Sequence, residues 1–321
     1  MTDWFQRLTG FAEDGYGPTR DRLRVEGDEL VSNVNGKRYG VGELTLPILS
    51  ELRMRVNPSR GQRTSVGTVV GEARALHREP EFAGALFQVA SQFNVLEMTS
   101  QDVTPEQGVT RYAWDLTQGP ACAIAAGAAT IYRNYFVPFP DGVGQTARRQ
   151  VDNLAGVGAA LSEHTGLAVA ALWEMRNGYA LCTTEGLRAI AWLLEGASEE
   201  MLDDLRGRLA IGLHRNVEVT DLDGDERRLV SQAFCSALPV GYGVRSGDWE
   251  PFARLVLEAT YEATLLAAAE QAGEGGSNTV LLTRVGGGVF GNDPAWIDAA
   301  IERALGVVSD AGLDVRMVQR G

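Results

Sequence analysis

The stretch TVLLTRVGGGVFGN, residues 279–292, places a cluster of glycines directly after an apolar run. The run over residues 279–285 predicts a strand, and Pro294 suits the first turn of a helix expected over residues 294–309. Glycines between a strand and a helix let a ligand approach the main chain closely, and amides at a helix start favour anions. A structural turn is the alternative, but we expect an anionic diphosphate to bind Gly286, Gly287, Gly288, Val289, Phe290, Gly291 and Asn292.

This loop differs from the common nucleotide-binding motifs. It matches neither the GxGxxG dinucleotide fingerprint nor the GxxxxGK[ST] phosphate loop. It contains no lysine, which argues against an ATPase. We therefore expect main-chain amides, without a metal or a cofactor, to bind the anion.

The rest of the second half alternates strands and helices around this loop. We expect strands over residues 227–238, 279–285 and 313–319, with helices over 249–272 and 294–309. Earlier in the chain, residues 83–90 are expected to form a buried strand and residues 122–135 a tightly packed helix. This alternation predicts an α/β protein whose sheet is covered by helices.

Two segments fall outside that alternation. Residues 1–80 are expected to be an accessory segment, with a β-hairpin over residues 21–39 and Asn35-Gly36 as its turn signal. Residues 81–321 are expected to be the main domain. Within it, residues from about 150 to 225 are expected to be a mostly helical insertion.

Composition restricts the function classes. The net charge of −13 opposes nucleic-acid binding, which needs a basic footprint. No stretch approaches the roughly 18 apolar residues of a membrane helix, and we expect neither membrane association nor a signal peptide. The three cysteines and three histidines lack ligand spacing, so we expect neither disulfides nor a metal site, and a cytoplasmic location.

Polar residues follow the strand over residues 83–90, where open α/β sheets bind ligands. Gln88 and Asn94 are candidate ligand contacts, and the Asn94 amide suits a pair of ribose hydroxyls. A strand-end cap is the alternative for Asn94. We expect Cys122 to be a small core residue and not a nucleophile. A second glycine-containing loop is expected to form another wall of the site, through Gln118, Gly119, Pro120, Ala121 and Cys122.

Four carboxylates are candidates for acid–base chemistry. Glu262 shares a helix face with Glu258, one turn away, and could point into the cleft; a solvated stripe is the alternative. Asp115 precedes the second loop, and Glu97 and Glu106 lie between the strand and that loop. In the cleft, Glu262 would act as an acid, a base or a ribose anchor. Asp115, Glu97 and Glu106, like Asp102 between them, could orient a water molecule or bind a cationic guanidinium leaving group. Glu262 and Asp115 are the leading candidates, with Glu97 and Glu106 behind them.

The chain resembles a divergent macrodomain over roughly residues 80–320. The resemblance is carried by the strings FQVASQFNVLEM, TQGPACAIAAGAATIYRNYF, FCSALPV and LLTRVGGGVFGN. The chain is similar to the macrodomains related to poly(ADP-ribose) glycohydrolases and to arginine-specific ADP-ribosylhydrolases of the MavL type. The resemblance implies a mixed sheet between helices, ADP-ribose or an ADP-ribosylated protein as partner, the diphosphate on the glycine loop and the distal ribose at Asn94.

The sequence departs from the macrodomain pattern in two places. Ser91-Gln92-Phe93-Asn94 replaces the usual Asn-x-Ala-Asn signature, and Gln118-Gly119-Pro120 replaces a triple glycine. The leading hypothesis is a hydrolase that removes ADP-ribose from a protein side chain, with arginine as the candidate side chain. The alternatives are an ADP-ribose reader without catalysis, and an interaction protein that uses the helical insertion.

Overall fold

A seven-stranded sheet forms the centre of the protein. The computed structural model describes residues 3–222, 224 and 226–319. Four neighbouring pairs of strands are parallel and two are antiparallel, so the sheet is mixed. Its strand order is β4 (Glu43–Thr45), β11 (Gly212–Glu218), β12 (Leu229–Cys235), β6 (Leu86–Ala90), β13 (Thr279–Leu282), β14 (Asp314–Gln319) and β5 (Ser65–Val70).

The alternation of side chains along β6 explains why both faces of the sheet are covered. Leu86 belongs to the large core beneath α11 (Trp249–Gly273), while Phe87 and Val89 belong to clusters on the other face. Successive side chains of a strand point to opposite faces of the sheet. Because β6 has apolar side chains on both faces, each face must be covered by a layer of helices. The predicted α/β class, a mixed sheet between helices, is confirmed.

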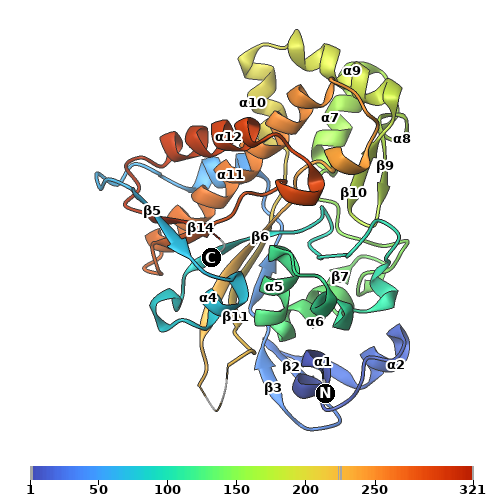
Figure 1. The fold of residues 1–321 in the computed structure, drawn as a ribbon, viewed down its shortest axis with the longest axis vertical. Coiled ribbons are helices and arrows are strands. Elements are labelled where there is room, and N and C mark those ends of the chain that lie inside the picture. The colour runs from blue at the N-terminus through green and yellow to red at the C-terminus, as the bar shows by residue number, and fades with distance from the viewer. Residues whose placement is uncertain (1–2, 223, 225, 320–321) are drawn as a thin grey trace.

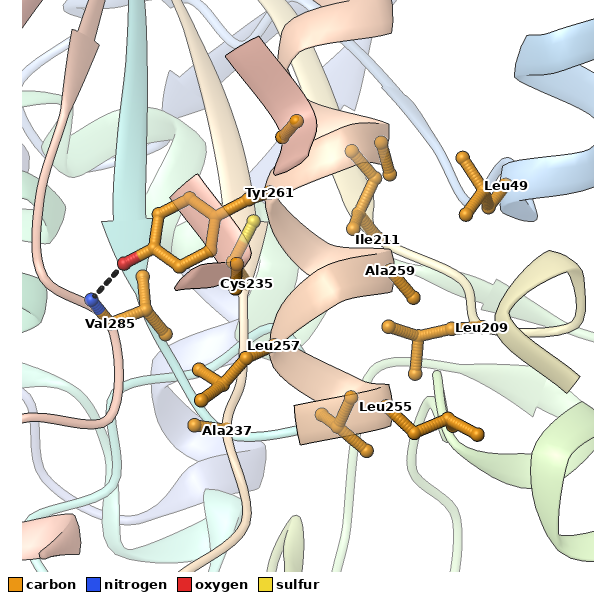
Figure 2. Close-up of a cluster of buried hydrophobic side chains, with 14 of the residues drawn as sticks. Leu49, Leu209, Ile211, Cys235, Ala237, Leu255, Leu257, Ala259, Tyr261 and Val285 are labelled. Atoms are coloured by element: carbon orange, nitrogen blue, oxygen red, sulfur yellow. Dashed lines mark hydrogen bonds between the residues drawn. The ribbon is translucent and has the colours of Figure 1, made fainter. Parts of the chain in front are cut away.

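The two helical layers come from different parts of the chain (Figure 1). On one face α11 packs against α12 (Pro294–Val307) and α3 (Leu49–Arg55). Figure 2 shows this core, where Leu49, Leu209 and Ile211 lie on one side of α11 and Tyr261 and Val285 on the other. The other face is covered by α4 (Ala73–Arg78), α5 (Gln118–Ala125) and α6 (Gly127–Tyr135).

The single helix expected over residues 122–135 is two helices, α5 and α6. Thr220 separates them: its hydroxyl accepts the Gly127 N–H at 2.8 Å, and its own N–H donates to the Ala125 carbonyl at 2.9 Å. Gly127 lies against the Trp4 ring, where an added Cβ would approach to 2.8 Å. Contacts with distant segments therefore end one helix and start the next.

The insertion contains a hairpin as well as helices. It comprises α7 (Ala155–Thr165), α8 (Val169–Leu172), β9 (Trp173–Arg176), β10 (Tyr179–Cys182), α9 (Thr184–Glu195) and α10 (Glu199–Gly207). Asn177-Gly178 forms the turn of the β9–β10 hairpin, with both residues at positive φ. Asn-Gly is a hairpin signal, so the prediction of a mostly helical segment is incomplete here. Residues 212–218 are strand β11 of the central sheet, so the helical part ends before residue 212.

The N-terminal unit and the insertion lie at opposite ends of the long axis (Figure 1). The unit contains α1 (Trp4–Thr9), α2 (Tyr16–Asp21) and a three-stranded sheet, β1 (Leu23–Glu26), β2 (Glu29–Ser32) and β3 (Arg38–Gly40). The expected hairpin is part of this sheet. β4, α3, β5 and α4 also come from the first 80 residues but belong to the main body, so the separate unit ends near residue 40.

The remaining elements are short. They are β7 (Pro138–Phe139), β8 (Gly142–Val143) and the 3₁₀ turns η1 (Pro80–Phe82), η2 (Pro105–Gln107), η3 (Thr110–Trp114), η4 (Val240–Tyr242) and η5 (Gly288–Phe290). Among the helices of the described residues, none combines the length and apolarity needed to cross a membrane.

Candidate functional site

A cavity of about 510 Å³ lies at the carboxyl ends of β6 and β13. Parallel strands present their carboxyl ends at one edge of a sheet, which is where open α/β folds bind ligands. The volume is in the range of small-molecule sites. Its walls are Ala90, Ser91, Gln92, Glu97, Met98, Thr99, Asp115, Thr117, Gln118, Gly119, Pro120, Tyr179, Ala237, Tyr242, Thr283, Arg284, Val285, Gly286, Gly287, Gly288, Val289 and Phe290.

The glycine loop is anchored at its start by a buried tyrosine. The Tyr261 hydroxyl on α11 donates to the Thr283 carbonyl at 2.8 Å. It also accepts the Val285 N–H at 2.8 Å, as Figure 2 shows. Gly286 has φ +81°, and an added Cβ would lie 2.5 Å from that of Ala237. Gly288 has φ +59°, but its Cβ position meets open space. The loop is thus packed at Gly286 and open at Gly288.

A tight turn places Glu97 in the cavity wall. Val95 has φ +58°, which is unusual for a β-branched residue. The Asn94 side-chain oxygen accepts the Leu96 N–H at 3.1 Å, and Arg133 donates to the Val95 carbonyl at 3.0 Å. The turn reverses the chain after β6 and brings Glu97 back to the cavity.

The carboxyl group of Glu97 is buried, and only one of its two oxygens has a hydrogen-bond partner. One oxygen, Oε1, lies 3.3 Å from a guanidinium nitrogen of Arg133, while Oε2 is buried without a hydrogen-bond partner. Burial raises the pKa of Glu97 to about 7, against the opposing pull of Arg133. Arg133 is itself held against the Phe234 ring, 3.8 Å from its centroid. Glu97 therefore has one buried oxygen without a partner, and its carboxyl can change protonation near neutral pH.

Asp115 lies at the end of η3 and lines the cavity from a partly exposed position. Its Oδ1 accepts the Thr117 N–H at 2.8 Å, which fixes the carboxylate relative to the start of α5. Burial, with smaller contributions from Tyr242 and Asp115, raises the pKa of Tyr179. A partly exposed carboxylate in a cavity wall can orient a water molecule.

The N-terminal unit holds the segment that carries Asp115. The Glu13 carboxylate accepts the N–H groups of Val109 and Thr110 at 2.9 and 2.7 Å. The Trp4 indole donates to the Thr110 carbonyl at 3.2 Å. These contacts hold the start of η3, so residues far from Asp115 in sequence determine where Asp115 lies.

The second loop forms a wall through its close approach to β6. The Gln118 side chain accepts the Ala90 N–H at 2.9 Å and donates to the Gln88 carbonyl at 2.8 Å. An added Cβ at Gly119 would lie 2.0 Å from the Ala90 carbonyl oxygen, so only glycine fits there. Both residues, and Pro120, line the cavity.

Three aromatic rings from separate segments close one part of the cavity. Tyr179 from β10, Tyr242 from η4 and Phe290 from the glycine loop pack with centroids 5.4 to 5.8 Å apart. Phe290 is thus packed against two tyrosines. Because Tyr179 belongs to the insertion, the insertion forms part of the cavity wall.

Several expected ligand contacts have structural roles instead. The Asn94 amide is buried and donates to Gln150 at 2.8 Å while its oxygen accepts from Leu96, as the capping alternative describes. The buried Gln88 amide connects β6 to Thr264 and Thr283. Cys122 is buried, and burial raises its pKa, as in a core residue. The residues that do not line the cavity are Gln88, Asn94, Ala121, Cys122, Gly291 and Asn292.

At the end of the glycine loop, Asn292 closes the loop rather than facing a ligand. Its side-chain nitrogen donates to the carbonyls of Leu238 and Gly286 at 2.9 and 3.1 Å. Gly291 has φ +70° and lies close to Gly241. Both residues hold the loop in place, while Gly286 to Phe290 form the cavity wall.

Glu262, a leading candidate from the sequence, lies outside the cavity in an ion-pair cluster. Its Oε1 accepts from Arg53 Nε at 2.6 Å, and its Oε2 binds Arg303. Arg53 also pairs with Asp203, which ties α3, α10, α11 and α12 together. The helix face that Glu262 shares with Glu258 points to arginines, so neither the cleft nor the solvated-stripe interpretation describes it. We assign it a stabilising role.

Glu106 is also outside the cavity. Both of its oxygens lie 2.9 Å from the Ala147 N–H, so the carboxylate connects η2 to the segment after β8. Of the four candidate carboxylates, the cavity brings together Asp115 and Glu97.

We expect Glu262→Gln to destabilise the protein by about 2 kcal/mol without changing ligand affinity. A partner removed from a buried ion pair costs up to about 3–5 kcal/mol, and the partial exposure of both arginines reduces this. Burial alone would raise the pKa of Glu262, but hydrogen bonds from Arg53 and Arg303 lower it. The stability difference from the variant should therefore be present at pH 7 and disappear as the pH falls below the usual carboxyl range. Denaturant unfolding at several pH values measures it.

No described group of three or more His, Cys, Asp or Glu side chains is placed to hold a metal ion. Tyr179, Tyr242 and Thr283 line the cavity but were not predicted from the sequence. The Asn177-Gly178 turn signal could have indicated the hairpin that carries Tyr179, whereas nothing local in the sequence marks Tyr242.

Comparison with known proteins gives structural neighbours only. No family model matches the chain, and no curated protein matches it. The chain is similar to poly(ADP-ribose) glycohydrolase from Deinococcus radiodurans in complex with ADP-ribose, at 15% identity and TM-score 0.43, covering 86% of each chain. It is also similar to poly(ADP-ribose) glycohydrolase from Thermomonospora curvata bound to the inhibitor ADP-HPD, at 14% identity and TM-score 0.44, covering 94% of this chain and 88% of that one. With TM-scores below 0.5, these similarities assign neither a substrate nor a residue role here.

Proposed function

We propose that the protein binds ADP-ribose in the cavity and hydrolyses its bond to a protein side chain. The observation that carries this is the meeting, in one cavity, of the open glycine loop at Gly288 with the carboxylates of Asp115 and Glu97. A loop of main-chain amides suits a diphosphate, and carboxylates suit ribose hydroxyls and water. The sequence resemblance to arginine-specific ADP-ribosylhydrolase macrodomains makes arginine the proposed attachment residue.

The two carboxylates suit different tasks. Asp115 is partly exposed and fixed by Thr117, so it is proposed to orient the attacking water. The unpaired Oε2 of Glu97 is proposed to accept a hydrogen bond from a ribose hydroxyl. In the hydrolysis, the bond from the ribose anomeric carbon to the side-chain nitrogen breaks. Water supplies a hydroxyl to the carbon and a proton to the leaving nitrogen.

The direct test uses an arginine-ADP-ribosylated protein as substrate and measures released ADP-ribose. The proposal expects release that increases with time and enzyme concentration. Calorimetry with free ADP-ribose should show binding in the same preparation. Binding without release would leave a reader, and the absence of both would refute the proposed function.

Glu97 gives the proposed activity a specific pH dependence. Because its pKa is raised to about 7, the carboxyl is largely protonated at pH 6 and ionised at pH 8. If the carboxylate accepts the ribose hydroxyl, kcat/KM should rise with pH through a limb near 7. Glu97→Gln should lower kcat/KM and remove this limb. Persistence of the same limb in the variant would assign the titration to another group.

A further inference from the structure

A second hollow lies next to the cavity. It has a volume of about 440 Å³ and is lined by Thr99, Arg111, Trp114, Asp115 and Leu116. Thr99 and Asp115 also line the main cavity, so the two spaces meet at the proposed catalytic carboxylate. A ligand that fills the cavity and passes Asp115 enters this hollow.

The side chains on either side of Asp115 are unusually exposed for their type. Trp114 is 79% exposed and Leu116 is 83% exposed. Across the cavity lining, Val289 of the glycine loop is 63% exposed and Tyr242 40%. Exposed large apolar residues that gather around a site mark surfaces where a partner binds, and Trp and Tyr dominate such surfaces.

We propose that the hollow at Trp114 is the subsite for the polypeptide that carries the ADP-ribosyl group. This rests on the proposed function, because Asp115 then acts at the bond between ADP-ribose and its attachment residue. The ADP-ribosyl part occupies the main cavity, and the peptide chain on the other side of that bond lies across Trp114 and Leu116. The substrate class is therefore an ADP-ribosylated polypeptide with apolar residues near the modified side chain.

Charge argues for a polypeptide over a further unit of an ADP-ribose polymer. Among the described residues that line the hollow, Arg111 is the single cation and Asp115 the single carboxylate, so the two charges offset each other. The Arg111 guanidinium also donates to the Gln107 side chain at 2.8 Å. A second diphosphate would meet no net positive charge on a protein whose net charge is −13. An apolar peptide does not need positive charge in order to bind.

The test compares affinities by calorimetry in the Asp115→Asn variant, in which the expected loss of kcat slows consumption of the substrate during the titration. An ADP-ribosylated arginine peptide should bind about tenfold more tightly than free ADP-ribose. Trp114→Ser in the same variant should remove this advantage and leave the affinity for ADP-ribose unchanged. Because Trp114 is exposed, the substitution should not alter the melting temperature.

Trp192→Ser is the matched control, since Trp192 on α9 is also 79% exposed but lines neither space. This control variant should still bind the ADP-ribosylated peptide about tenfold more tightly than free ADP-ribose. If ADP-ribose binds but the peptide has no advantage, or Trp114→Ser does not change it, the subsite is refuted while the proposed function stands. A Trp114-dependent gain for an ADP-ribose oligomer in place of the peptide would also refute it. Failure of free ADP-ribose to bind would instead refute the proposed function.

Discussion

Asp115→Asn is expected to lower kcat for release of ADP-ribose by about 100- to 1,000-fold, the usual range for loss of a general base. Asparagine has the same shape, and its side-chain oxygen can still accept the Thr117 N–H that Asp115 accepts at 2.8 Å. The turn and the start of α5 should therefore stay in place, and the affinity for ADP-ribose should change by less than about threefold. Steady-state kinetics and calorimetry separate the two effects.

Glu106→Gln is the control for this prediction. Glu106 is the same kind of candidate from the sequence and lies only nine residues earlier, but its carboxylate binds the Ala147 N–H outside the cavity. It should retain wild-type kcat. Equal losses in the two variants, or an unchanged kcat in Asp115→Asn, would remove Asp115 from the mechanism.

Gly288→Asp is expected to weaken ADP-ribose binding by about 10- to 100-fold. Gly288 lines the cavity, and its Cβ position meets no atom within 4 Å, so the new carboxylate would enter free space beside the proposed diphosphate. Like charges a few ångströms apart at a protein surface repel by a few kcal/mol, reduced by salt. Calorimetry at two salt concentrations measures both the loss and its screening.

Gly288→Asn separates charge from shape in this experiment. Asparagine and aspartate have nearly the same volume, and both tolerate the left-handed conformation that φ +59° requires. The asparagine variant should bind within about threefold of the wild type. If both variants bind ADP-ribose like the wild type, the phosphates do not lie at this loop and the assignment of the diphosphate site fails.

The parts of the fold that could be predicted depend on short stretches of chain. The strands around residues 86–90 and 279–282, the long helix α11 and the helix from Pro294 follow from apolar periodicity and from residues that start or end helices. The strand β11 and the β9–β10 hairpin were not predicted, because they lie in a region rich in Leu and Ala. Burial of β11 comes from pairing with β4 and β12, which its own sequence does not reveal.

In the candidate site, too, some features follow from local sequence and others depend on contacts between distant segments. The sequence alone indicates a glycine loop between a strand and a helix, because glycine adopts the positive φ of Gly286 and Gly288 without strain. Only the tertiary structure decides that Glu97 faces the cavity while Glu262 faces arginines. A carboxylate's role depends on the charges and burial around it, and those are supplied by segments such as α3 and α6 that lie far away in the chain.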